Sequence, residues 1–250
     1  MTRFIKNWIL RFFKPEYHLP LRYYWRKING NLDAEMLIVD RLLDSANLFI
    51  DIGTNIGIYS YHFRNKFAFI EAFEPIDEVT NSLESIKLSN VRVNHVALSS
   101  NQGDLELRVP VEKGEPVYTR ATLEKKCVNS YVSRQIIVKT LDQYSFEYVD
   151  LIKIDVEGHE LDVIAGARET IMKWKPILIV EIEKRHLGHD MEAVFSSIML
   201  LGYEGFFITN NRLRSIINFS YTKYQEPYIE TPKAREYINN FISIPCRRKI

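Results

Sequence analysis

The chain has 250 residues, of which 46% are hydrophobic and 26% are charged. This composition is that of a folded globular protein and excludes wholesale disorder. The 33 basic and 32 acidic residues give a formal net charge of +1. This balance argues against a general nucleic-acid-binding protein, so no nucleic-acid partner is predicted.

The cysteines and histidines form no recognisable framework. Cys127 and Cys246 provide neither a disulfide pattern nor a paired metal-binding motif. A reducing compartment is therefore expected, and we predict a cytoplasmic protein. His186 and His189 are interpreted as polar loop residues, and no metal site is assigned. Because no stretch of about 18 uncharged apolar residues occurs, no membrane span is predicted.

The first 30 residues are basic, with seven Lys or Arg and one acid. Residues 1–14 fit an amphipathic helix ending at Pro15, because their aromatic and aliphatic side chains share one half of the helical wheel. Such a helix is typical of one lying among lipid headgroups, on the inner face of the membrane. Packing on the main domain is the alternative. We predict an extension over 1–30 and one domain over 31–250.

From residue 33 onward, helical segments alternate with short apolar runs. Asp33 is a suitable cap for a helix that ends near residue 43. Further helices are expected at 57–65, 77–89, 160–173 and 190–201, and strands at 48–51, 67–73, 91–97, 151–155 and 177–182. This alternation predicts an α/β domain with a mostly parallel sheet. The strands are continuously apolar, which predicts helices on both faces.

The region 103–140 interrupts this alternation. Residues 105–109 and 136–138 have strand character, and Gly103 and Gly114 fit turns, so an antiparallel insertion is expected here. Two more strands are expected near 204–208 and 213–219.

The loop after the first strand reads DIGTNIG over residues 51–57. In a doubly wound sheet, this first strand-to-helix crossing is where a nucleotide-like ligand binds. The two glycines stand four residues apart, which excludes the dinucleotide fingerprint, and no phosphate-binding Gly-Lys-Ser/Thr follows. Asp51 would suit a cationic ammonium group. A ligand with a nucleoside and an amino acid but no pyrophosphate is S-adenosylmethionine.

Two further strand ends complete this expected ligand site. Glu74 follows the second strand, 23 residues after Asp51, where a carboxylate can accept hydrogen bonds from a ribose diol. A solvated strand-end carboxylate is the alternative. Ala97, at the end of the third strand, is small enough to let an adenine ring lie flat.

The fourth strand and the turn after it are unusually charged. Lys153, Asp155 and Glu157 share one face, because side chains alternate along a strand. Such charges are costly unless they line a site or pair with one another, and an internal Lys153–Asp155 ion pair is one alternative. Glu181 ends the adjacent fifth strand, and His159 lies nearby. This cluster predicts a proton acceptor, or a site that recruits a divalent cation.

The segments FIDIGTNIGIYS, AFEP, VALSS, TLD, DLIKIDVEGHELDVIAGA and PILIVEIE follow one another over about residues 47–210. In this order they resemble the FkbM family of S-adenosylmethionine-dependent methyltransferases. The resemblance implies a Rossmann-like, class I methyltransferase fold with a seven-stranded sheet. It also implies methyl transfer to an oxygen, often of a sugar in a surface polysaccharide, a glycolipid or a secondary metabolite. Thr54 stands where a small residue such as Ala is expected.

The resemblance also implies roles for individual residues. Cofactor binding is expected at Asp51, Gly53, Thr54, Asn55, Gly57, Glu74 and Ala97, and acceptor contacts at Asp155, Glu157, His159 and Glu181. We expect Glu157 or Asp155 to take the hydroxyl proton, with His159 as the competing choice.

Three other functions stay open at this point. They are a cation-assisted methyltransferase using Asp155 and Glu181, a different nucleotide-using enzyme such as a dehydrogenase, and a catalytically idle nucleoside-binding module that docks on membranes. The expected partner is a small-molecule or glycan acceptor, and the sequence predicts no oligomeric state.

Overall fold

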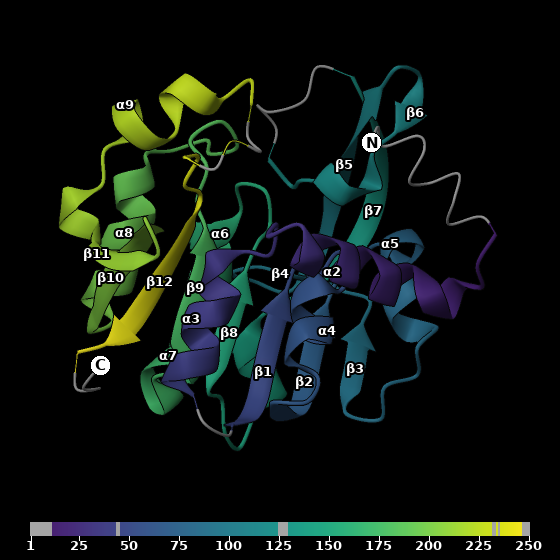
Figure 1. The fold of residues 1–250 in the computed structure, drawn as a ribbon, viewed down its shortest axis with the longest axis horizontal. Coiled ribbons are helices and arrows are strands. Elements are labelled where there is room, and N and C mark those ends of the chain that lie inside the picture. The colour runs from purple at the N-terminus through teal and green to yellow at the C-terminus, as the bar shows by residue number, and fades with distance from the viewer. Residues whose placement is uncertain (1–11, 44–45, 125–129, 232–233, 235, 247–250) are drawn as a thin grey trace.

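The structure is a computed structural model that describes residues 12–43, 46–124, 130–231, 234 and 236–246. Within these residues, a central sheet of eight strands runs through the molecule in the order β11-β10-β12-β9-β8-β1-β2-β3 (Figure 1). Its strands are β1 (Ala46–Ile52), β2 (Phe67–Phe73), β3 (Val91–Asn94), β8 (Leu151–Ile154), β9 (Ile177–Glu181), β10 (Tyr203–Thr209), β11 (Arg212–Ser215) and β12 (Asn240–Pro245).

The sheet is parallel from β3 to β9 and antiparallel from β9 to β11. The expected parallel core is therefore confirmed, but the sheet has eight strands, one more than the seven that were expected. The hairpin of β10 and β11 adds an edge strand. The sequence analysis missed β12, because its pairing with β9 and β10 joins segments that are far apart in the chain.

Helices cover both faces of the sheet, as the apolar strands predicted. One face carries α2 (His18–Ile28), α3 (Ala34–Leu42), α4 (Ile58–Phe63) and α5 (Asp77–Glu84), which share a buried cluster with the sheet. The other face carries α6 (Glu160–Gly166), α7 (Arg168–Trp174) and α8 (Met191–Leu200), which share a second cluster. The single helix expected over 160–173 is divided at Ala167. A short helix, α9 (Tyr221–Tyr224), and 3-10 turns at Pro15–Tyr17, Leu141–Tyr144, Ile216–Asn218 and Glu226–Tyr228 complete these regions.

The predicted antiparallel insertion forms a second sheet above the carboxyl ends of the parallel strands (Figure 1). Among the described residues, its order is β4-β7-β5-β6, with β4 (Ala97–Leu98), β5 (Gly103–Glu112), β6 (Glu115–Pro116) and β7 (Tyr131–Lys139). A 3-10 turn, Tyr118–Arg120, follows β6. The strand expected over 91–97 is split: β3 joins the central sheet, whereas β4 pairs with β7. This split brings the insertion over the central sheet.

The predicted amphipathic helix over 1–14 lies almost wholly outside the described residues. The next segment, α2, packs on the domain: Leu19 and Tyr23 are buried, and the Tyr23 hydroxyl lies 2.9 Å from Nδ1 of His62. In the part of the chain that the structure describes, no helix has the length and apolar character needed to cross a bilayer. The domain boundary at residue 30 stays a prediction.

Candidate active site

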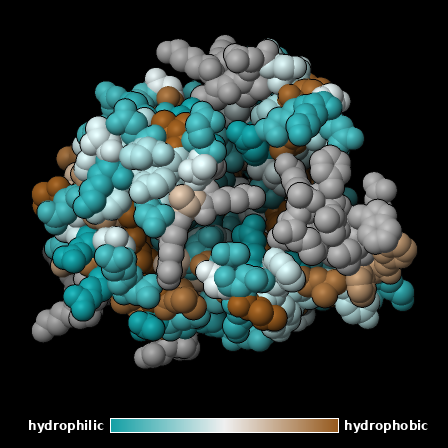
Figure 2. Space-filling model, turned by 45° about the horizontal axis from the view of Figure 1, so that its top comes forward, coloured by the Kyte–Doolittle hydropathy of each residue, from teal (hydrophilic) through white to brown (hydrophobic). Residues whose placement is uncertain are grey.

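A pocket lies at the carboxyl ends of the parallel strands, below the insertion sheet. The space within the pocket and its open mouth is about 730 Å³, part of which is open solvent. With the top of the molecule turned forward, the surface is visibly hollowed near its centre (Figure 2). Eight of the predicted site residues line the pocket, namely Gly53, Asn55, Glu74, Ala97, Asp155, Glu157, His159 and Glu181. Asp51, Thr54 and Gly57 do not.

The glycine turn lies in close contact with the end of β8. Gly53 has φ +72°, and a Cβ there would lie 1.8 Å from the carbonyl oxygen of Asp155. Gly57 has φ +84°, and its Cβ would lie 2.8 Å from Leu83 Cδ2. Both positions therefore require glycine for left-handed backbone and for space. The amides of Gly53 and Thr54 donate to the carbonyl of Phe73, which ties the turn to the end of β2.

Asp51 stabilises this turn through hydrogen bonds to Thr54 and Ser60. Its buried carboxylate accepts hydrogen bonds from Thr54 Oγ1 at 2.7 Å, from Ser60 Oγ at 2.6 Å and from the Ser60 amide at 3.2 Å. Burial raises the pKa of Asp51, although Lys153 and these donors oppose the rise. The structure thus turns Asp51 away from the pocket, where the sequence analysis had expected an ammonium-binding group. The hydroxyl of Thr54 accounts for its presence where Ala was expected.

Glu74 lies at the pocket wall, as predicted. Its two oxygens accept from the amides of Asn55, at 3.0 Å, and Ile76, at 3.2 Å. Burial raises the pKa of Glu74 to about 7. Asn55 has left-handed backbone, with φ +53°. Its side-chain amide donates to the carbonyl of Thr119 in the insertion. Carboxylate oxygens have further acceptor capacity, so Glu74 is held in place and can still bind hydroxyl groups.

At the end of β8, Asp155 both forms the internal ion pair with Lys153 and lines the pocket. Lys153 is buried, and its Nζ lies 2.7 Å from Asp155 Oδ2 and 4.7 Å from the centre of the Tyr59 ring. Burial alone would lower the pKa of Lys153, but Asp155 and Asp51 outweigh it and raise that pKa. Asp155 therefore lines the pocket with one of its oxygens already paired to a cation.

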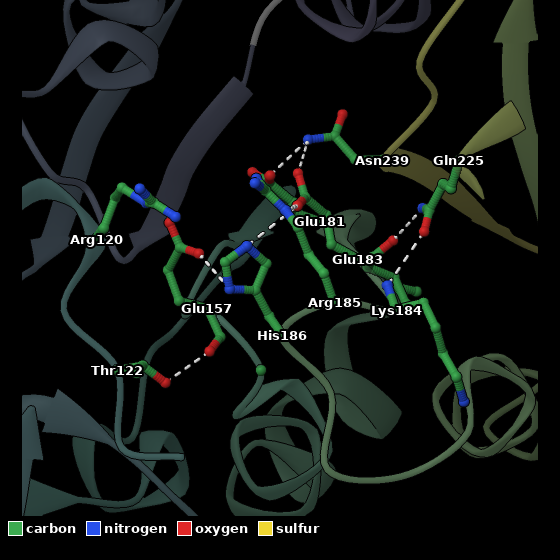
Figure 3. Close-up of polar contacts among 12 residues, drawn as sticks. Arg120, Thr122, Glu157, Glu181, Glu183, Lys184, Arg185, His186, Gln225 and Asn239 are labelled. Atoms are coloured by element: carbon green, nitrogen blue, oxygen red, sulfur yellow. Dashed lines mark hydrogen bonds and ion pairs between the residues drawn. The ribbon is translucent and has the colours of Figure 1, made fainter. Parts of the chain in front are cut away.

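Glu157 belongs to a partly buried acid–imidazole–acid chain (Figure 3). Its Oε2 lies 3.1 Å from His186 Nδ1, and His186 Nε2 lies 3.1 Å from Glu183 Oε2. Burial raises the pKa of Glu157 to about 7, and His186 opposes that rise. His186 lies in a loop, as predicted, and its ring pairs with these two acids. Its loop closes on the turn after β8, where a Cβ on Gly158 would lie 2.4 Å from the His186 carbonyl oxygen.

Glu181 and Glu183 both accept hydrogen bonds from Asn239, the residue just before β12. Nδ2 of Asn239 lies 2.5 Å from Glu181 Oε1 and 2.8 Å from Glu183 Oε1 (Figure 3). Burial raises the pKa of Glu181 well above its usual value. Burial would also raise the pKa of Glu183, but hydrogen bonds from His186 and Arg185 lower it below its usual value. Of the two carboxyl groups, Glu183 therefore carries the negative charge more readily than Glu181.

His159 uses both ring nitrogens. Its Nε2 lies 2.9 Å from Ser99 Oγ, and its Nδ1 lies 3.3 Å from Glu124 Oε1. Sequence reasoning missed these partners, which come from the end of β4 and from the insertion. Because both nitrogens are engaged, His159 suits a role in joining the two sheets better than a role as base.

The insertion provides much of the pocket wall opposite the carboxylates, which the sequence analysis left without named residues. The lining side chains from this region are Leu107, Tyr118, Thr119, Ala121, Thr122 and Leu123. Among the residues that the structure describes, no three or more His, Cys, Asp or Glu side chains come together in a way that could hold a metal ion.

Comparison with known proteins identifies the family of this chain. A family model described as the methyltransferase FkbM domain matches residues 51–206. The chain is 29% identical over 228 residues to methyltransferase sdnD of Sordaria araneosa, covering 74% of this chain and 85% of the relative. It is 26% identical over 174 residues to the hexuronic acid methyltransferase AglP of Haloferax volcanii, covering 68% of each chain.

A solved structure shows the same fold. It is a methyltransferase FkbM from Methylobacillus flagellatus, with a TM-score of 0.50 and 17% identity, covering 79% of this chain. The match spans 43% of that protein. The family match extends from Asp51, at the start of the glycine turn, to Phe206 in β10, and so includes all the pocket-lining acids. This chain belongs to the FkbM family of methyltransferases.

Proposed function

We propose that this chain transfers a methyl group from S-adenosylmethionine to a hydroxyl oxygen of a sugar or another small molecule. The observation that carries the proposal is the distribution of acids around one pocket. Glu74 lies on one side, beside the glycine turn, and Asp155, Glu157 and Glu181 lie on the other. The relative named as a hexuronic acid methyltransferase supports a sugar acceptor, in a surface polysaccharide or glycolipid.

The residues present fit the cofactor. Glu74 offers a fixed carboxylate to a ribose diol, and Ala97 with Val96 and Leu98 offers an apolar wall for an adenine ring. Gly53 lines the pocket with backbone atoms alone. When bound, S-adenosylmethionine supplies an electrophilic methyl group.

This chain would contribute positioning and a proton acceptor. Holding the hydroxyl oxygen at reacting distance is worth about 7–11 kcal/mol in favourable cases, and a placed base adds about 10²–10⁴-fold. Glu157 is the stronger candidate for that base, because its pKa of about 7 suits proton transfer near neutral pH. Asp155 is the weaker candidate, since one of its oxygens is already paired with Lys153.

Calorimetry on the full chain tests the cofactor assignment. S-adenosylhomocysteine should bind and NAD should not, and Glu74→Gln should weaken S-adenosylhomocysteine binding while leaving the melting temperature near that of the wild type. Binding of NAD alone would instead indicate a dehydrogenase, and binding of neither ligand would indicate an idle module.

An assay with labelled S-adenosylmethionine and a panel of sugars and hexuronic acids tests the reaction. O-methylated product should form, and Glu157→Gln should lower turnover about 10²–10⁴-fold. Near-normal turnover in both Glu157→Gln and Asp155→Asn would refute the choice of base. Loss of turnover in excess chelator, restored by a divalent cation, would favour the cation-assisted reaction.

We also propose a cytoplasmic location, with peripheral membrane contact through residues 1–14. The support is the alternation of aromatic and basic residues in that segment. Deletion of residues 1–14 should release the protein from anionic vesicles and preserve S-adenosylhomocysteine binding. Equal vesicle binding by the shortened protein would contradict this role.

A further inference from the structure

Helix α2 presents an apolar stripe to solvent. Leu21, Tyr24, Trp25 and Ile28 are all exposed, Ile28 to 83%. At 100° per residue, these four positions fall within about 100° of the helix circumference.

This stripe is separate from the face that α2 uses for folding. Leu19 and Tyr23 lie on the opposite side of the helix and are buried against the domain. A surface helix of a globular protein normally has one apolar face, directed inward, and a polar face toward water. Since the inner face of α2 is already packed, the outer stripe does not serve the domain core.

The charges that flank the stripe favour an anionic lipid surface over a second apolar protein surface. Arg22 lies beside one edge of the stripe and Lys27 beside the other, whereas Arg26 lies nearer the packed face. Among residues 12–30, Glu16 is the only acid, against four Lys or Arg. Tyr and Trp are the side chains that occupy the headgroup level, and long cations extend beside them to phosphate.

We propose that the stripe formed by Leu21, Tyr24, Trp25 and Ile28 is a docking surface for membranes containing anionic lipid. The helix would lie flat, with this stripe among the headgroups and its cations near the phosphates. Because α2 packs on α4, which begins directly after the glycine turn, docking would bring the pocket region near the membrane. The surface is distinct from residues 1–14 and does not depend on the proposed methyl transfer.

Flotation of the full-length protein with lipid vesicles tests this. The protein should float with vesicles of phosphatidylcholine and phosphatidylglycerol, and the bound fraction should fall with added salt and with vesicles of phosphatidylcholine alone. The triple variant Leu21→Gln, Trp25→Gln, Ile28→Gln should lower the partition coefficient on the order of a hundredfold.

A matched variant controls for the loss of exposed apolar surface as such. Met199, Leu200 and Ile217 are also exposed and lie away from α2, so replacing all three by Gln should leave vesicle binding unchanged. Replacing Lys27 by Gln should weaken binding about fivefold. Circular dichroism and S-adenosylhomocysteine binding should match the wild type in each variant, which separates docking from the cofactor site.

Three results would overturn the proposal. The first is equal flotation of the stripe variant and the wild type. The second is failure of the wild type to float with anionic vesicles. The third is a wild-type dimer that becomes a monomer in the stripe variant without any vesicle binding, which would show that a second copy of the chain covers this face.

Discussion

Gly53, in the turn beside the pocket, has two reasons to be glycine, and replacing it by Ala tests both. The backbone there is left-handed, at φ +72°, and the added Cβ would lie 1.8 Å from the Asp155 carbonyl oxygen. Left-handed backbone costs a non-glycine residue roughly 1–2 kcal/mol. Overpacking costs about 1–3 kcal/mol, and here the obstacle is backbone, which cannot rotate aside. We expect Gly53→Ala to lower the free energy of unfolding by about 2–5 kcal/mol, the sum of the two costs.

Two other glycines isolate each contribution. Gly30 has φ +64° with nothing within 4 Å of its would-be Cβ, so Gly30→Ala should cost only the backbone part. Gly166 does not have left-handed backbone, but its Cβ would lie 2.0 Å from the Ser99 carbonyl oxygen, so Gly166→Ala should cost only the contact part.

Urea unfolding followed by circular dichroism measures all three variants. The cost at Gly53 should approach the sum of the costs at Gly30 and Gly166. S-adenosylhomocysteine affinity should fall in Gly53→Ala and stay near wild type in Gly30→Ala. A cost at Gly53 no larger than that at Gly30 would refute the close approach of the turn to β8.

The remaining predictions concern pH. Burial raises the pKa of Glu160 from its usual value of 4.5 to about 7, and the buried Oε2 has no hydrogen-bond partner among the described residues. The folded state therefore holds a proton that the unfolded state has lost, so stability should fall as pH rises from about 4.5 to 7. Glu160→Gln should remove this part of the fall and be more stable than wild type at pH 8 by on the order of 2 kcal/mol, as unfolding at several pH values would show. A pH dependence unchanged by the substitution would contradict it. The pair of Glu157 with His186 gives the second prediction: His186 lowers the pKa of Glu157, so His186→Gln should raise that pKa and move the acid limb of the rate profile to higher pH. His189→Gln, in the same loop, is the control and should leave the limb in place, and identical profiles for both variants would rule out this coupling.

Much of the candidate site follows from local sequence patterns. Alternating apolar segments predicted β1, β2, β8 and β9, and the carboxyl ends of parallel strands meet at one edge. That rule alone placed Glu74, Asp155 and Glu181 around one crevice, which the structure confirms. The glycine spacing in the first turn also differs from the dinucleotide fingerprint, which is a property of the sequence alone.

Contacts between residues far apart in the chain could not be predicted from the sequence. The partners of His159 and Glu157 come from the insertion and from the loop after β9, and nothing in the local pattern links Ser99 or His186 to them. Likewise, the direction of Asp51 depends on Ser60 in the following helix. Side-chain direction at a strand end is set by what packs there.

The sequence by itself determined the element types, the parallel core and the acids at its edge, because periodicity and strand polarity are local properties. Only the tertiary structure decided that β12 enters the sheet, that Asp51 faces away from the pocket and that Glu157 is backed by an imidazole. Those outcomes depend on which distant groups satisfy one another's hydrogen bonds and charges once water is excluded.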